Sequence, residues 1–218
     1  MDSDKSSSVS VLVGTCDAEP YQKIWPLFDA CFRKYWQVDC PVIFAGETIP
    51  VPGYETVLTE GAWGGRMLAA LERVKTEYVI FFLEDYLLEK EIVSSFIYEQ
   101  VNILERFKAD KVMFDKLYEP GVYDLQSLGG ELFRFNKKSG YLNSAQPAVW
   151  KTDYLKRVLL PDCSPWGWEI DLNSRTAAMN PTIILNNTGR IYFNFCRRGG
   201  RLEEGAAEFL EKEGLTYV

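Results

Sequence analysis

The stretch Tyr78-Val79-Ile80-Phe81-Phe82-Leu83 is followed at once by two acids, Glu84 and Asp85. Six apolar residues in a row are typical of a central strand that is covered on both faces, whereas a half-exposed strand alternates polar and apolar residues. The sequence therefore predicts a buried strand over 78–83 with two carboxylates at its carboxyl end.

The residues around this strand alternate between strand and helix patterns. We expect strands over 9–13 and 41–45 and helices over 24–36, 63–74 and 91–108. Pro26 suits the first turn of its helix, where the missing N–H costs nothing. The order strand–helix–strand–helix–strand–helix predicts a doubly wound α/β sheet.

Beyond about residue 110 the pattern changes to short strands and loops. Strands are expected over 111–114, 131–135, 145–150, 182–185 and 191–195, and helices over 152–160 and 203–212. Asn187-Thr188-Gly189 has the composition of a hairpin turn. The expectation is one α/β domain over 9–218 whose second half is a mixed sheet, preceded by a disordered leader over 1–8.

Composition excludes several classes of function. The 218 residues carry 24 basic and 31 acidic side chains, a net charge of −7, so no overall field attracts nucleic acid. No run approaches the roughly 18 apolar residues of a membrane span, and the first residues lack the plan of a secretory signal. Five scattered cysteines indicate reduced thiols. We therefore expect a cytoplasmic protein, at most peripherally associated with the inner face of a membrane.

The chain contains no histidine. This excludes Ser-His-Asp and Cys-His catalysis and His-rich metal sites, and leaves acid–base chemistry to carboxylates, Lys, Tyr or Cys. A bound metal would have oxygen ligands, which favours Mg²⁺ or Mn²⁺. P-loop, dinucleotide-binding and nucleophile-elbow motifs are also missing from the sequence.

Glu84 and Asp85 form the sharpest local feature. Ligands of open α/β sheets bind beyond the carboxyl ends of the strands, and two adjacent acids there need a cation or hydrogen-bond donors. A divalent cation that also binds a diphosphate would satisfy both. The alternative is a solvated turn after a core strand.

A second feature is Pro165-Trp166-Gly167-Trp168-Glu169, with Asp171 two positions on. The faces of Trp166 and Trp168 could stack on a sugar while the acids accept hydroxyl protons, and a carboxylate shielded by Trp is a suitable general base. Alternatively, the tryptophans belong to the core and Glu169 lies in the first turn of a helix.

Two weaker features complete the candidate site. Arg197, Arg198 and Arg201 surround a Gly-Gly turn and could bind phosphate. Thr15 and Asp17 follow the first strand and could contact a nucleoside. A solvated loop and an ordinary strand-end turn are the respective alternatives.

Taken together, several stretches resemble the bacterial GT-A-type glycosyltransferases of capsule, O-antigen and other surface-polysaccharide gene clusters. The stretches are Tyr21…Trp25-Pro26 with Lys34-Tyr35-Trp36, Trp63…Arg66-Met67-Leu68, 83–88, Gln146-Pro147-Ala148-Val149-Trp150 and 165–169. The resemblance runs from about residue 9 to 215.

The resemblance implies a GT-A-like, Rossmann-like sheet whose nucleotide-binding half covers about 9–110 and whose acceptor-binding half covers about 111–218. It implies that Glu84 and Asp85 bind a divalent cation and the donor ribose, and that Glu169 is the base of an inverting transfer, with Asp171 beside it. The remaining assignments are donor binding by Thr15, Asp17, Trp63, Arg66, Glu84, Arg197 and Arg198, and substrate binding by Tyr86, Gln146, Trp166 and Trp168.

The expected function is transfer of a sugar, as by a hexosyltransferase, from a nucleotide-sugar co-substrate to a glycan or lipid-linked acceptor. The common Asp-x-Asp form is altered here, since Leu83 precedes Glu84 and Tyr86 follows Asp85. The arginines could therefore neutralise the leaving diphosphate instead of a metal. A sugar nucleotidyltransferase and a non-catalytic sugar-binding or scaffold protein are the alternatives.

Overall fold

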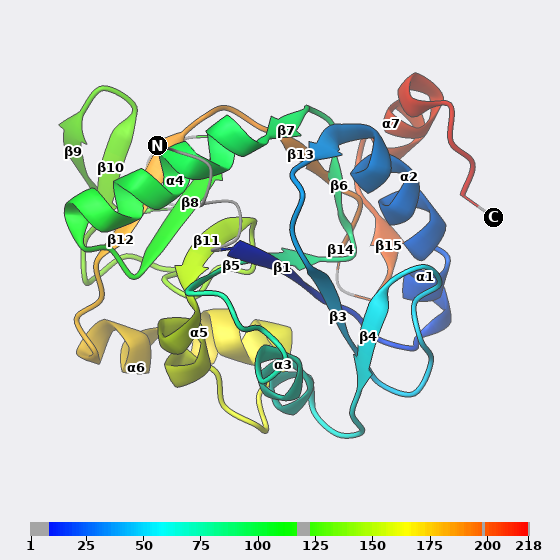
Figure 1. Ribbon diagram of the computed structural model, residues 1–218, viewed down its shortest axis with the longest axis horizontal. Helices are drawn as coiled ribbons and strands as arrows, with labels where there is room; N and C mark the ends of the chain where they lie inside the picture. The colour runs from blue at the N-terminus through cyan, green and yellow to red at the C-terminus, as the bar shows by residue number, and fades with distance from the viewer. Residues whose placement is uncertain (1–8, 117–122, 198, 218) are drawn as a thin grey trace.

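A computed structural model of the chain describes residues 9–116, 123–197 and 199–217 (Figure 1). The main feature is a nine-stranded mixed sheet with the strand order β4-β3-β1-β5-β11-β8-β12-β10-β9 and helices on both faces. The predicted class, a mixed α/β sheet flanked by helices, is confirmed. The expected leader over 1–8 lies outside the described residues.

The first half of the chain supplies four parallel strands. They are β1 (Val9–Gly14), β3 (Val42–Gly46), β4 (Glu55–Leu58) and β5 (Tyr78–Leu83). β1 lies between β3 and β5, so the chain first builds outward on one side of β1 and then crosses to the other. This reversal is a topological switch point, and ligands of open α/β sheets bind outside the carboxyl ends of the strands at such a point.

The second half completes the sheet with mixed pairing. Its strands are β8 (Lys111–Asp115), β9 (Leu125–Gly129), β10 (Leu132–Phe135), β11 (Ala148–Lys151) and β12 (Ile183–Asn187). β11 runs antiparallel between β5 and β8, and β12 is parallel to β8. One sheet therefore includes strands from both halves of the chain.

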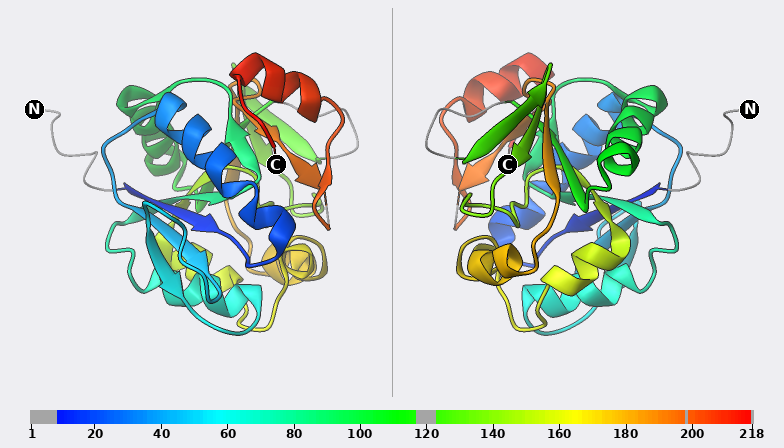
Figure 2. Two further views of the ribbon diagram at one scale, coloured as in Figure 1. Left: turned by 90° about the vertical axis from the view of Figure 1, so that its right-hand side faces the viewer. Right: turned by 90° about the vertical axis from the view of Figure 1, so that its left-hand side faces the viewer.

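The helices form two layers. α2 (Trp25–Tyr35), α4 (Ser94–Phe107) and α7 (Ala206–Glu213) contribute to one core, and α3 (Trp63–Leu71) and α5 (Thr152–Val158) contribute to the other. The side views place α4 and α3 on opposite sides of the strands (Figure 2). Two short helices, α1 (Glu19–Gln22) and α6 (Asn173–Ala178), and a π-helical turn, η2 (Gly167–Asp171), complete the set.

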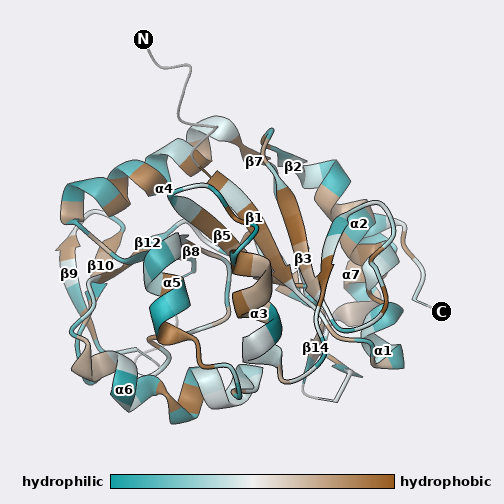
Figure 3. Ribbon diagram, turned by 60° about the horizontal axis from the view of Figure 1, so that its bottom comes forward, coloured by the Kyte–Doolittle hydropathy of each residue, from teal (hydrophilic) through white to brown (hydrophobic). Residues whose placement is uncertain are grey.

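Alternate residues of the central strands enter the two cores. In β5, Ile80 and Phe82 pack under the α2/α4 layer, while Val79 and Phe81 pack under the α3/α5 layer. β1, β3 and β5 are accordingly hydrophobic along most of their length (Figure 3). Burial on both faces explains why the 78–83 run is continuous rather than alternating.

Three small two-stranded sheets extend the fold. β2 (Trp36–Gln37) pairs with β7 (Ile92–Val93), β6 (Tyr86–Leu88) with β13 (Tyr192–Asn194), and β14 (Cys196–Arg197) with β15 (Arg201–Leu202). The hairpin predicted at Asn187-Thr188-Gly189 is wrong. β12 joins the main sheet, whereas β13 leaves it to pair with β6, so these residues connect two different sheets.

Candidate active site

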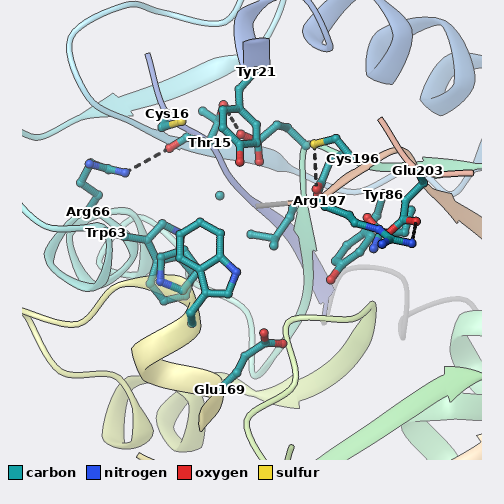
Figure 4. A pocket seen from close by; sticks show the side chains of 17 residues that line it. Thr15, Cys16, Tyr21, Trp63, Arg66, Tyr86, Glu169, Cys196, Arg197 and Glu203 are labelled. Atoms are coloured by element: carbon teal, nitrogen blue, oxygen red, sulfur yellow. Dashed lines mark hydrogen bonds and ion pairs between the residues drawn. The ribbon is translucent and has the colours of Figure 1, made fainter. Parts of the chain in front are cut away.

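A cavity of about 400 Å³ lies at the carboxyl ends of β1 and β5, at the switch point of the sheet (Figure 4). Its lining comes from both halves of the chain. The lining residues are Gly14, Thr15, Cys16, Tyr21, Trp63, Arg66, Leu83, Glu84, Asp85, Tyr86, Pro165, Trp166, Glu169, Asn194, Cys196, Arg197 and Glu203. The acids that end β5 and the carboxylate of Glu169 therefore share one cavity.

Glu84 is held by a chain of hydrogen bonds at the end of β1. The indole Nε1 of Trp25 donates to Thr15 Oγ1 at 2.8 Å, and that hydroxyl donates to Glu84 Oε1 at 3.2 Å. Glu84 is 5% exposed. Burial, and then the neighbouring Asp85, raise the pKa of Glu84 well above its usual range. The Thr15 side chain thus positions Glu84, and both line the cavity.

Only one of the two carboxylate oxygens of Asp85 accepts a hydrogen bond. Its Oδ2 accepts from the Cys196 thiol at 3.4 Å, and its carbonyl accepts from the Phe195 N–H at 2.8 Å. Its Oδ1 is buried and has no hydrogen-bond partner. Burial raises the pKa of Asp85 to about 7, and the charges of Glu169 and Glu203 add to the rise. A buried acceptor without a partner is costly unless a ligand satisfies it.

The donor set of these two acids fits a divalent cation. Mg²⁺ is usually held by one or two carboxylates together with phosphate oxygens and water, and Glu84 and Asp85 can supply the carboxylates. Among the described residues, no group of three or more His, Cys, Asp or Glu side chains is arranged to hold a metal by itself. A cation on these two carboxylates would take its remaining ligands from phosphate oxygens and water.

Arg66 is fixed at the N-terminal end of α3. Its Nη1 donates to a carboxylate oxygen of Glu47 and to the carbonyl of Gly61 at 2.9 Å, and its Nη2 donates to the Thr15 carbonyl at 3.4 Å. The guanidinium Nε is buried without a partner. Arg66 therefore keeps one spare donor, although Glu47 offsets its charge.

Glu169 lies in η2, across the cavity from Thr15 and Tyr21 (Figure 4). Its Oε1 accepts from the Ala145 N–H at 2.6 Å. Burial raises the pKa of Glu169, while the Ala145 N–H and the charge of Lys111 oppose the rise. A partly desolvated carboxylate with a raised pKa has the properties of a general base.

The two tryptophans beside Glu169 have different positions. Trp166 is 37% exposed and lines the cavity. Trp168 has no exposed surface, and its ring packs against Trp63, Trp150 and Phe81 with centroids 5.5–5.8 Å apart. The expectation that Trp168 stacks on a substrate does not fit this position, because a fully buried ring offers no face to a ligand.

The segment that carries Glu169 is attached to α3. The Gly64 N–H donates to the Cys163 carbonyl at 2.9 Å and the Gly65 N–H to the Pro161 carbonyl at 2.8 Å. The approach is so close that a Cβ on Gly64 would lie 2.0 Å from the Leu160 carbonyl oxygen. Glycine at this position therefore allows the loop to reach the first turn of the helix.

Several predicted site residues lie elsewhere. Asp17 accepts from the N–H and hydroxyl of Thr48 at 2.8 and 2.6 Å, so it connects two loops outside the cavity. Asp171, the last residue of η2, is exposed and does not line the cavity, whereas Glu169 in the middle of the same turn does. Arg198 lies outside the described residues.

Gln146 and Arg197 lie at the edge of the site. Gln146 accepts from the Tyr123 hydroxyl at 3.0 Å and lines a separate pocket of about 200 Å³. That pocket shares Asn194 and Glu203 with the main cavity. Arg197 lines the main cavity, and its guanidinium pairs with Glu203 at 2.7 Å. Tyr86, at the start of β6, lines the main cavity.

Sequence reasoning missed several cavity residues. They include Tyr21 on the short helix α1, Cys196 on β14 and Glu203 directly after β15, and the pairing of β14 with β15 has no local sequence signal. Lys111 does not line the cavity but acts on Glu169 by its charge, and it was detectable as a lone cation at the start of the apolar strand β8.

The comparisons with known proteins concern the fold. No protein-family model matches the chain, and no curated protein matches it. TarS from S. aureus, in a 1–349 segment in complex with UDP, superimposes with a TM-score of 0.56 at 17% identity, over 85% of this chain and 59% of that one. The same segment with UDP-GlcNAc gives 0.53 at 16% identity, over 88% and 59%.

A CMP:2-keto-3-deoxy-manno-octonic acid synthetase complexed with CTP gives a TM-score of 0.56 at 12% identity, over 95% of this chain and 98% of that one. This chain thus spans less than two thirds of the TarS segment but nearly the whole synthetase. At these identities the likeness establishes the fold. The chain has the GT-A-like mixed sheet that the resemblance implies. In the part of the chain that the structure describes, no helix is long and apolar enough to span a membrane.

Proposed function

We propose that this protein is a glycosyltransferase that moves a sugar from a nucleotide-sugar to a hydroxyl of a glycan or lipid-linked acceptor in surface-polysaccharide synthesis. The observation that carries the proposal is the shared cavity, in which Glu84 and Asp85 face the same space as Glu169. The likeness of the fold to structures solved with UDP, UDP-GlcNAc and CTP supports a nucleotide-containing ligand.

The donor is assigned to the β1 and β5 side of the cavity. Thr15, Tyr21 and Arg66 lie around the end of β1, where the nucleotide would bind. A divalent cation held by Glu84 and Asp85 would neutralise the diphosphate as it leaves. The Nε–H of Arg66 supplies a further hydrogen-bond donor at this end, and the guanidinium of Arg197, which pairs with Glu203, lines the same cavity. Charge placed in advance where a leaving group becomes negative lowers the barrier.

The acceptor is assigned to the Glu169 side. Trp166 offers a partly exposed indole on which a sugar ring can stack, next to the Glu169 carboxylate. Glu169 removes the proton of the acceptor hydroxyl as this attacks the anomeric carbon, on the face opposite the leaving diphosphate, which gives inversion. The positions of donor and acceptor on facing sides of one cavity supply the orientation that such a displacement needs.

A transfer assay with a panel of nucleotide-sugars and a glycan acceptor tests the proposal. We expect Glu169→Gln to lower kcat about 10²–10⁴-fold, the usual contribution of a general base, and Asp85→Ala to weaken donor use. Glu211→Gln, an exposed substitution of the same kind on α7, is the matched control and should leave turnover unchanged. Turnover near wild type in both site variants would contradict the proposal.

A sugar nucleotidyltransferase is the second candidate, favoured by the near-complete coverage of the synthetase chain. Gly14-Thr15-Cys16-Asp17 lacks the Gly- and Arg-rich pyrophosphate loop expected after the first strand of such an enzyme. Incubation with nucleoside triphosphates and free sugars separates the two candidates. Release of pyrophosphate indicates the nucleotidyltransferase, whereas release of nucleoside diphosphate from a nucleotide-sugar indicates the glycosyltransferase. Binding without either product would indicate a non-catalytic protein.

A further inference from the structure

Lys111 is a fully buried cation at the start of β8. It pairs with Trp150 of β11 on one side and with Ile183 of β12 on the other, so it lies in the middle of the sheet. Lysine is almost never fully buried unless it is paired. No carboxylate among the described residues forms an ion pair with it. Other groups must therefore compensate the burial of its ammonium.

The ammonium of Lys111 binds a loop that leads to Glu169. Nζ donates to the Ser144 carbonyl at 2.9 Å and to the Leu142 carbonyl at 3.4 Å, and it lies 4.3 Å from the centre of the Trp150 ring. The next N–H along the chain, that of Ala145, donates to Glu169 Oε1 at 2.6 Å. The Ser144 carbonyl and the Ala145 N–H belong to one peptide group.

That peptide group therefore lies between an ammonium and a carboxylate. A cation on the carbonyl oxygen polarises the peptide and strengthens its N–H as a donor, and such hydrogen bonds are stronger in a buried setting. The donor fixes Oε1 of Glu169, and Oε2 is left to receive a proton.

We propose that Lys111 is a positioning residue for the base Glu169 and acts on it through the Ser144–Ala145 peptide group. This inference rests on the proposed function for the role of Glu169. The connection from Lys111 through the Ser144–Ala145 peptide group to Glu169, here called the bridge, is a property of the folded protein. The coupling between the two side chains can therefore be measured without an activity assay.

The direction of the pKa shifts agrees with this coupling. Burial lowers the pKa of Lys111 to about 7, and the charge of Glu169 opposes the fall. Conversely, Lys111 opposes the rise in the pKa of Glu169 that burial causes. The other charged groups of the cavity are Glu84 and Asp85 at the end of β5, Arg66 on α3, and Arg197 and Glu203 around β14 and β15.

The first test is an NMR titration of the Lys111 side chain in lysine-labelled protein. Coupling between two sites is reciprocal, so loss of the Glu169 charge must make Lys111 easier to deprotonate. We expect Glu169→Gln to lower the Lys111 pKa by roughly one unit. Asp153→Asn, which removes an exposed carboxylate on α5, should not move it. An identical Lys111 titration in wild type and Glu169→Gln would overturn the proposal.

The second test is a kinetic double-mutant cycle. Lys111→Met should move the acid limb of kcat/KM about one unit to higher pH, so that the rate at a fixed pH on that limb falls about tenfold. In a Glu169→Gln background, Lys111→Met should lower kcat/KM no further. An equal loss in both backgrounds, with an unmoved acid limb, would show a merely structural role. If Lys111→Met does not fold, the NMR titration of Lys111 alone tests the proposal. If no nucleotide-sugar is turned over, the proposed function fails, but the titration still tests the coupling of Lys111 to Glu169.

Discussion

At the scale of single residues, the site depends on carboxylates whose burial is only partly compensated. Thr15 Oγ1 connects Trp25 to Glu84, and the Ala145 N–H fixes Glu169. Asp85 keeps a buried oxygen without a partner. Acids with strongly shifted pKa values in a cavity are typical of functional sites, because catalysis and binding need pKa values matched to their task.

Removal of the Thr15 hydroxyl should destabilise the fold. Thr15→Val leaves the Trp25 N–H and Glu84 Oε1 without that partner in a buried setting, and each unsatisfied group costs about 1–3 kcal/mol. We expect the free energy of unfolding in urea to fall by about 2–6 kcal/mol, the sum for the two groups. Thr216→Val, at an exposed position, is the control. Equal stability of the two variants would disprove the assigned role of the hydroxyl.

The pH dependence of the reaction should reflect Glu169. A general base must be deprotonated, and burial raises the pKa of Glu169. Activity should therefore be lost as the pH falls through this raised pKa, so that the acid limb of kcat/KM lies above about 4.3, the ordinary value for glutamate. A pH–rate profile measures the limb. An acid limb that persists unchanged in Glu169→Gln would assign it to another group.

At the scale of elements, the contact of α3 with the 160–163 loop sets the position of Glu169. Gly64→Ala would place a methyl group 2.0 Å from the Leu160 carbonyl oxygen, whereas Gly65→Ala would place one 3.2 Å from the Pro161 carbonyl oxygen. Both gain about 1 kcal/mol of helix propensity. We expect Gly64→Ala to lose about 1–3 kcal/mol through overpacking and Gly65→Ala to lose less.

Thermal unfolding and the KM for the acceptor measure this effect. Both variants replace a glycine of α3 with alanine. A difference between them in stability or KM therefore reports the close approach of the Leu160 carbonyl to Gly64. If Gly64→Ala is as stable as Gly65→Ala and has the same KM, the loop does not depend on that approach.

The elements also show how far sequence patterns reach. The 78–83 run identifies β5 because burial on both faces leaves no polar position. The same reasoning cannot separate Trp166 from Trp168, since η2 turns one indole to the cavity and the other into the core. Nor can it place Asp17, whose partner Thr48 comes from a distant loop. The types and order of residues are visible in the local sequence, whereas the partners that side chains meet from distant segments are not.

At the scale of the whole molecule, β11 joins the two halves. It lies antiparallel between β5 from the first half and β8 from the second. The two halves proposed for donor and acceptor therefore share one sheet, and we expect them to unfold together. We expect a single urea transition, coincident by circular dichroism and by tryptophan fluorescence. Two separated transitions would show that the halves are independent units.

The sequence predicted the class of fold better than it predicted the strand pairings outside the parallel half. Alternating strands and helices over 9–110 determine the parallel half, but the pairing of β6 with β13 depends on residues about a hundred positions apart. The Asn187-Thr188-Gly189 hairpin failed for this reason.

The central claim is that the acids ending β5 and the carboxylate of Glu169 act on one nucleotide-sugar in one cavity. A crystal structure with a bound nucleotide-sugar and Mn²⁺ tests it most directly. We predict an anomalous manganese peak beside Asp85 and Glu84, the diphosphate next to it, and the anomeric carbon facing Glu169. A nucleotide-sugar bound outside this cavity, or with its anomeric carbon turned away from Glu169, would contradict the account.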